Sequence, residues 1–192
     1  MKTSNFFWNL TSTEFVNFLD LLANISEQQG CKNPFEDFRT LFEDTQEISK
    51  QSKVIDMSVE FIENGKRILQ NHIDEIVAKD LPVSDFIVDN YNSNTKKLSN
   101  IVEERMILFS EYKKIIEREK VINKKSEEVY KYWDILMNDC SISKSVLDQI
   151  EQLLTEFKEI VVQKKKIIKK RMEIISKERL LIEESKNLFN IK

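Results

Sequence analysis

Glycine and proline are scarce in this chain of 192 residues, which contains two of each. Folds built on β-sheets need such turn residues at regular intervals between their strands. Charged residues make up 33% of the chain and apolar residues 41%, so each helix can bury one face and solvate the other. Disorder is disfavoured because disordered chains combine charge with a shortage of apolar residues. The composition therefore predicts an all-α protein.

Cysteine and histidine are also rare, and their scarcity excludes several kinds of chemistry. Cys31 and Cys140 are too few for a disulfide scaffold or a zinc site, so they are interpreted as reduced thiols of a cytoplasmic protein. His72 is the only histidine, which rules out metal sites built from His pairs. Gly30 and Gly65 cannot form a phosphate-binding loop. We therefore expect no catalytic residues, no metal, no cofactor and no enzymatic activity.

Long apolar runs are missing as well. No stretch approaches the ~18 apolar residues of a membrane span, and Glu14 and Asp20 interrupt any signal-peptide core. The charge is uneven, with a net −5 over residues 1–48 and +4 over residues 141–192. Such polarity can direct an anionic partner to one part of the chain.

Apolar residues recur at helical spacing over most of the sequence. The signal fades through residues 49–53, where we expect a break or kink, and is weakest over residues 90–100. The pattern predicts a single elongated domain over residues 1–192, an antiparallel bundle of long coiled-coil-like helices spanning residues 1–30, 33–57, 58–138 and 145–190.

Local signals set these boundaries. Thr11 and Glu14 match a capping box at the start of the first helix, and Gly30 is expected to end it. Pro34 follows Asn33 at the start of the second helix. At Pro82 we expect a kink in the third helix rather than a chain reversal, because the apolar stripe resumes within about one turn.

The last helix carries an apolar doublet every seven residues, which favours a coiled-coil seam. A third column begins with Ile150 and Phe157 but then becomes polar, and so interrupts the seam. The doublet consists of Val146, Leu153, Ile160, Ile167, Ile174, Leu181 and Leu188 with their neighbours Leu147, Leu154, Val161, Ile168, Ile175, Ile182 and Phe189. The polar residues of the third column are Lys164, Arg171, Glu178 and Ser185.

Helices this long need their stripes covered. We expect antiparallel packing within the chain and, over the remainder, a two-fold homodimer. Phenylalanines of the first two helices are assigned to the dimer interface: Phe15, Phe18, Phe35, Phe38 and Phe42.

Two basic groups are candidate binding surfaces. The first group has acids among its bases, so a solubilising face explains it as well as a binding surface does. The second group has six bases in eight residues and no acid. Such clusters attract acidic lipid headgroups, whereas the acidic net charge and the lack of interleaved aromatic residues argue against nucleic acid. The lipid-binding candidates are Lys113, Lys114, Lys124 and Lys125 in the first group, and Lys164, Lys165, Lys166, Lys169, Lys170 and Arg171 in the second.

Several short blocks in residues 1–137 carry a resemblance to a known family. They are Phe7-Trp8 with Gln29-Gly30, Phe35-x-x-Phe38-Arg39, Asn71-His72 with Ile76-Val77, Tyr112-Lys113-Lys114, and Asn123-Lys124-Lys125 with Tyr130 and Trp133. These blocks resemble the F-BAR (FCH-BAR) family, and the opening block is most similar to fungal members that carry a Rho GTPase-activating domain. That catalytic domain is absent here.

The resemblance implies a banana-shaped dimer that binds and bends membranes, packed through its first three helices and lined with basic residues on its concave surface. It also implies protein partners from cytoskeletal or small-GTPase pathways. The likeness weakens after Asn138, where the family continues with further helices and this chain has one. The chain is therefore interpreted as a truncated F-BAR domain, a short paralogue or a different helical arm.

Two functions follow from these observations. The first is a peripheral membrane protein of the cytoplasmic leaflet, an F-BAR-type dimer that binds acidic phospholipids through basic helix faces. The alternative is a coiled-coil scaffold or tether that binds proteins and not lipid.

Overall fold

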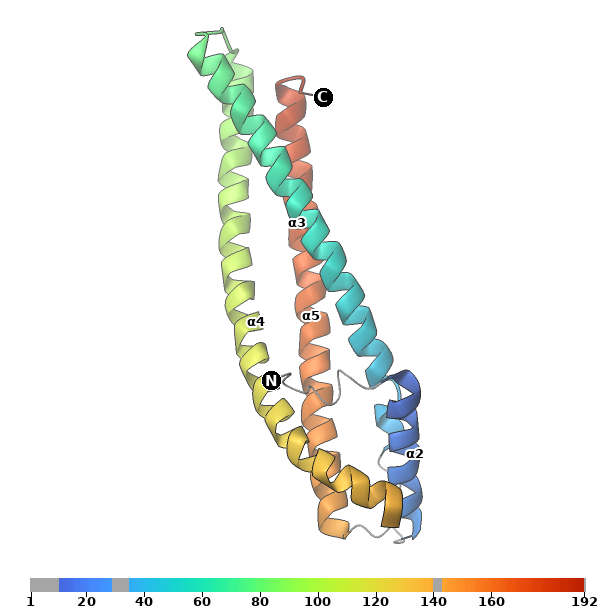
Figure 1. Ribbon diagram of the computed structural model, residues 1–192. Helices are drawn as coiled ribbons and strands as arrows, with labels where there is room; N and C mark the ends of the chain where they lie inside the picture. The colour runs from blue at the N-terminus through green and yellow to red at the C-terminus, as the bar shows by residue number, and fades with distance from the viewer. Residues whose placement is uncertain (1–10, 29–34, 140–142, 192) are drawn as a thin grey trace. The chain divides into compact units, whose positions relative to one another are not determined.

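The computed structural model describes residues 11–28, 35–139 and 143–191. Helices make up nearly all of these residues and no strand occurs among them, which confirms the all-α prediction. The elements are α2 (Ser12–Gln28), the short 3₁₀ helix η1 (Glu36–Phe38), α3 (Leu41–Ala78), α4 (Asp85–Asp139) and α5 (Lys144–Leu188) (Figure 1).

The predicted capping box is present at the start of α2. The backbone N–H of Thr11 donates to Glu14 Oε2 at 2.7 Å, and the backbone N–H of Glu14 donates to Thr11 Oγ1 at 3.2 Å. These bonds satisfy donors that the first turn of a helix otherwise leaves open. The hydrogen bonds from the Thr11 backbone and hydroxyl also lower the pKa of Glu14 below its usual 4.5. The signals at Phe7-Trp8, Gly30 and Asn33-Pro34 lie outside the described residues.

The second helix was predicted to span residues 33–57 with a break or kink at 49–53, and both the span and the break are corrected. Helix α3 begins at Leu41, after η1, and continues to Ala78 without interruption. Four buried residues seven positions apart keep one face on the core on both sides of the polar segment: Ile48, Ile55, Ile62 and Leu69. Because tertiary packing covers this face, the poor helical pattern between Ile48 and Ile55 is tolerated.

The predicted continuous helix over residues 58–138 is also wrong, because α3 ends before Pro82. Asp80 adopts a left-handed conformation with φ of 49°. The N–H of Leu81 donates to the carbonyl of Ile76, and that of Asp80 donates to the carbonyl of Val77. This pair of bonds is a Schellman motif, which closes the end of a helix.

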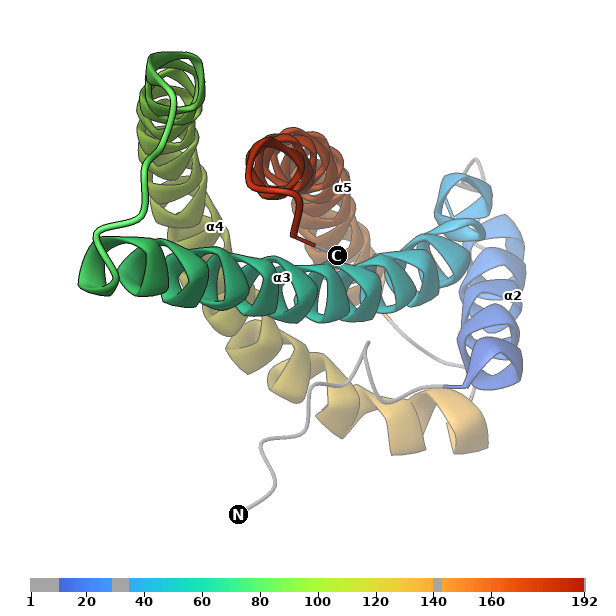
Figure 2. The ribbon, with the colours of Figure 1, turned by 90° about the horizontal axis from the view of Figure 1, so that it is seen from above.

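Helix α4 then starts in the opposite direction. The backbone carbonyl of Ser84 accepts hydrogen bonds from the N–H groups of Ile87 and Val88, and Asp85 places an acid in the first turn. Figures 1 and 2 show the resulting hairpin of α3 and α4. Pro82 therefore lies in a chain reversal between two helices rather than at a kink.

Two compact units can be distinguished in the chain. Unit 1 comprises Met1–Ser49 and Tyr112–Lys166, and unit 2 comprises Lys50–Glu111 and Ile167–Lys192. In each unit α5 packs against parts of both α3 and α4, and the second column of the heptad doublet is buried from Leu147 to Ile182. The heptad repeat is thus covered largely by helices of the same chain, so it no longer requires a second copy.

Candidate functional site

Lys164, the first base of the run at residues 164–171, lies inside unit 1. It is 6% exposed, and its Nζ donates to both carboxylate oxygens of Glu119 at 2.6 Å. Glu119 is 8% exposed and belongs to α4, so the pair joins α4 to α5 where little water reaches. The prediction that Lys164 binds lipid is therefore wrong, because its ammonium group is held inside the bundle.

Two more bases of this run contact acids from other helices. Lys165 pairs with Asp44 of α3 in unit 1, and the Nζ of Lys170 lies 4.0 Å from Glu111 Oε2 of α4 in unit 2. The absence of acids within the run had suggested uncompensated repulsion, but the packed helices supply them. Half of the six charges are therefore balanced within the chain.

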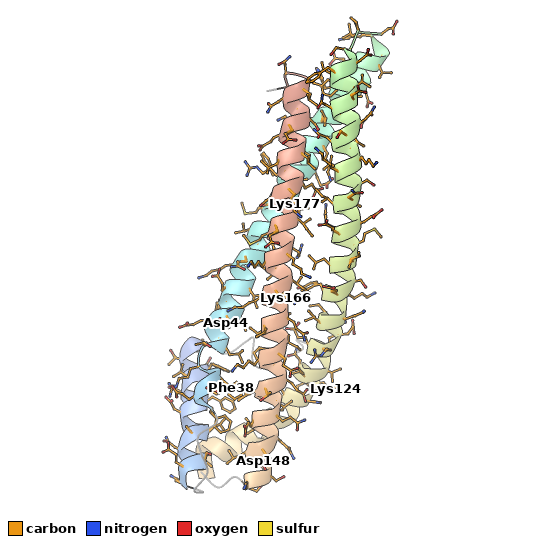
Figure 3. All side chains as sticks on the ribbon, turned by 180° about the vertical axis from the view of Figure 1, so that it is seen from behind. Phe38, Asp44, Lys124, Asp148, Lys166 and Lys177 are labelled. Atoms are coloured by element: carbon orange, nitrogen blue, oxygen red, sulfur yellow. The ribbon has the colours of Figure 1, made fainter. Side chains whose placement is uncertain are left out.

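The other three bases of the run differ in their surroundings. Lys166 and Lys169 are exposed and Arg171 is half-buried, and none of them forms an ion pair with a residue that the structure describes. Lys166 and Lys169 are three positions apart on α5, so they lie on neighbouring parts of one helix face. Figure 3 shows Lys166 on α5.

The predicted basic group of α4 lies in unit 1. It also contains both bases that pair with an acid and bases that do not. Lys125 donates to both oxygens of Glu156 of α5 at 3.1 Å. Lys113, Lys114 and Lys124 are exposed and make no ion pair within the described ranges. Lys113 and Lys124 are eleven residues apart, about three turns, and so share a side of α4. We call the following set the solvent lysines: Lys113, Lys114, Lys124, Lys166 and Lys169.

The polar residues that interrupt the third column of α5 are mostly buried. In unit 2 Glu178 is 1% exposed and accepts hydrogen bonds from Lys66 of α3 at 2.6 Å and Arg105 of α4 at 3.2 Å. Ser185 is fully buried, and its hydroxyl accepts a hydrogen bond from Asn94 of α4 at 3.2 Å. Buried polar groups of this kind hold neighbouring helices in one register.

Lys66 has its charged form stabilised by this arrangement. Partial burial acts against the ammonium ion, but hydrogen bonds to Glu178 and Glu63 and the charges of both carboxylates outweigh it. The pKa of Lys66 therefore lies above its ordinary value of 10.5.

Four of the five phenylalanines assigned to the dimer interface are buried within the single chain, so the prediction is corrected for these four. Phe15, Phe18, Phe35 and Phe38 are 1–5% exposed within the single chain, and Phe42 is half-buried with its ring 6.2 Å from that of Phe15. Phe38 also receives a cation–π contact from Lys158 of α5. A ring already covered in this way has almost no surface left to bury against a partner.

Two exposed apolar faces were missed by the sequence interpretation. The face on α3 consists of Val54, Met57, Phe61 and Ile68, whose exposed fractions are 38–72%. The face on α4 includes Val102, Met106 and Phe109. The spacing of three and four residues was readable in both helices, but each set flanks a stronger buried stripe that dominated the pattern.

His72 and one surface groove are the remaining features to consider as sites. His72 packs its ring on that of Phe189, 6.0 Å away, and no group of three potential metal ligands occurs among them. A groove of about 300 Å³ between α4 and α5 in unit 2 is flanked by the pairs Lys170–Glu111 and Lys177–Glu104, so four of its five charged side chains are paired with each other.

None of the helices, over the residues described, is both long and apolar enough to span a membrane. The chain matches no protein-family model, no curated protein and no solved structure.

Proposed function

We propose that this chain binds acidic membrane surfaces peripherally, as an F-BAR-type protein, through the solvent lysines. The observation that carries the proposal is the division of the bases into two classes. Of the ten bases predicted to bind lipid, four pair with an acid of another helix, Arg171 is half-buried, and the five solvent lysines are exposed on α4 and α5. The resemblance of residues 1–137 to the F-BAR family makes a bilayer the anionic surface we favour.

The structure reduces the attraction expected from the run at residues 164–171. A base near an acidic leaflet contributes about 1 kcal/mol, so Lys166 and Lys169, even with the half-buried Arg171, supply at most about 3 kcal/mol where six bases would supply about 6. About 3 kcal/mol corresponds to roughly a 150-fold gain in affinity. The attraction decays over a Debye length of ~10 Å at 0.1 M salt, so binding should weaken steeply as salt is added.

Vesicle co-sedimentation with defined variants tests this proposal. The double variant Lys166→Gln/Lys169→Gln should bind phosphatidylserine-containing vesicles roughly 30-fold more weakly than wild type, because two bases are removed. Lys96→Gln/Lys97→Gln is the matched control, since it removes two exposed bases from α4 in unit 2. Equal losses in both variants, or no binding by wild type at low salt, would contradict a role for these lysines.

A scaffold that binds protein is the second candidate, and the apolar face of α3 favours it. Val54, Met57, Phe61 and Ile68, with Asn64, follow the alternating spacing of three and four residues that defines a coiled-coil seam. The seam covers about two heptads, fewer than the three or four of a sustained coiled coil. In the second proposal the chain therefore forms a homodimer through this α3 seam. We expect the dimer to form in a concentration-dependent manner rather than permanently.

Sedimentation velocity tests the α3 seam, and vesicle co-sedimentation of the wild type separates the two proposals, because the scaffold binds no lipid. Met57→Glu/Phe61→Glu should abolish self-association while leaving vesicle binding by the monomer in place. Should wild type remain monomeric up to high micromolar concentration, the α3 seam is not a dimer interface.

A further inference from the structure

The tip of the α3–α4 hairpin extends past the end of α5. The ring of Phe189, just after α5, meets His72 of α3 and Tyr91 of α4 at 6.0 and 5.7 Å. Residues 73–90 therefore lie beyond the level of the third helix, as Figures 1 and 3 also show. At ~1.5 Å per residue, each arm continues about 9 Å further without a third helix beside it.

Three large apolar side chains are exposed at this tip. Val77 in the last turn of α3 and Phe86 in the first turn of α4 are 73% and 70% exposed, and Leu81 in the turn between them is 49% exposed. A rigid turn holds them, because the Schellman bonds of Asp80 and Leu81 fix the end of α3. Large apolar side chains that stay exposed on both sides of one turn are a common mark of a contact with another molecule.

The charges around the tip decide which molecule fits. Residues 74–89 contain five acids, Asp74, Glu75, Asp80, Asp85 and Asp89, against one base, Lys79. Lys79 already pairs with Glu75. The rim is therefore negative, and the like charges of an acidic bilayer would be repelled from it.

We propose that the hairpin tip, residues 74–89, docks a basic amphipathic segment of another protein. Apolar anchors of that segment cover Val77, Leu81 and Phe86, while its lysines or arginines face the acids of the rim. Such complementarity speeds association and selects the partner by charge. This surface is separate from the solvent lysines, so the proposal does not depend on membrane binding.

Fluorescence anisotropy with a designed probe tests this inference on the full chain. The probe is a labelled 16-residue helical peptide of leucine and lysine with the leucines on one face, and its counterpart has glutamate in place of every lysine. Wild type should bind the lysine peptide in a salt-dependent manner and should not bind the glutamate peptide. Asp85→Asn/Asp89→Asn should weaken binding and flatten its salt dependence.

The matched pair of phenylalanines on α4 controls for general stickiness. Phe86 and Phe109 are 70% and 69% exposed, so Phe86→Ala and Phe109→Ala remove equally exposed rings from the same helix. We expect at least a tenfold loss of peptide binding for Phe86→Ala and less than a twofold change for Phe109→Ala. Equal effects, absence of binding by wild type, or a loss of vesicle binding or self-association instead of peptide binding in Phe86→Ala would overturn the proposal.

Discussion

Removing the carboxylate of Glu119 should destabilise this protein far more than removing an acid from an exposed pair. Glu119→Leu removes the carboxylate that accepts both of the hydrogen bonds described above from the ammonium group of Lys164, a residue that lies inside unit 1 and is 6% exposed. Breaking a buried pair in this way costs about 3–5 kcal/mol. Asp44→Asn breaks the ion pair between Asp44 and Lys165, whose side chains are 29% and 43% exposed respectively. This change should cost about 0–1 kcal/mol.

The double variant Glu119→Leu/Lys164→Met completes the comparison. It replaces both charges with apolar groups of similar size, so it should regain the loss and be neutral or up to about 4 kcal/mol more stable than wild type. Urea unfolding followed by circular dichroism gives each free energy of unfolding, provided that the slope with denaturant stays constant. The reasoning fails if Glu119→Leu and Asp44→Asn agree within about 1 kcal/mol, or if the double variant is no better than Glu119→Leu.

Three further predictions follow from individual contacts. A Cβ at Gly65 would lie 3.0 Å from Cγ2 of the buried Ile182, so Gly65→Leu should cost about 1–3 kcal/mol on thermal unfolding, whereas Leu at the exposed Asp56, outside the α3 seam, should change stability by under about 0.5 kcal/mol. The stabilising contribution of ionised Glu14 should be present above its unfolded pKa of 4.5 and be lost as pH falls through the lower native pKa. Thr11→Ala removes only the hydroxyl and keeps the backbone N–H, so the native pKa of Glu14 should rise part of the way towards 4.5, and an unchanged value in an NMR titration would contradict the contribution of the hydroxyl. The contribution of charged Lys66 should be fully present below pH 10.5 and be lost as pH rises through its raised native pKa. Lys66→Met should therefore lose less thermal stability than wild type above that pH, and identical alkaline profiles would refute this.

Features set by neighbouring residues could be predicted from the sequence. The capping box of Thr11 and Glu14 involves two residues three positions apart, and both of its backbone bonds are present. The heptad doublet of α5 was equally readable, because its period persists over the whole helix and the structure buries most of it. All-helical character follows from the same periodicity.

Features that depend on distant residues could not be predicted in this way. The sequence shows the charge of Lys164 but not Glu119, its partner 45 positions away on another helix. The reversal at Pro82 was missed because the apolar pattern continued across it, while the residue that ends α3 is Asp80, in a conformation that glycine usually adopts. The phenylalanines of α2, η1 and α3 were assigned to a dimer because the burial that unit 1 provides was not apparent from their spacing.

Lysine labelling read by mass spectrometry tests the central claim most directly, because one experiment compares the buried and the exposed bases. The native chain is treated briefly with an amine-reactive reagent, with and without phosphatidylserine-containing vesicles, and the modification rate of each lysine is measured. We predict slow modification of Lys164 and fast modification of Lys166 and Lys169, with vesicles protecting Lys166, Lys169, Lys113 and Lys124 but not Lys96 and Lys97. Modification of Lys164 as fast as that of Lys166, or vesicle protection that is equal at all these lysines or absent from them, would contradict the account.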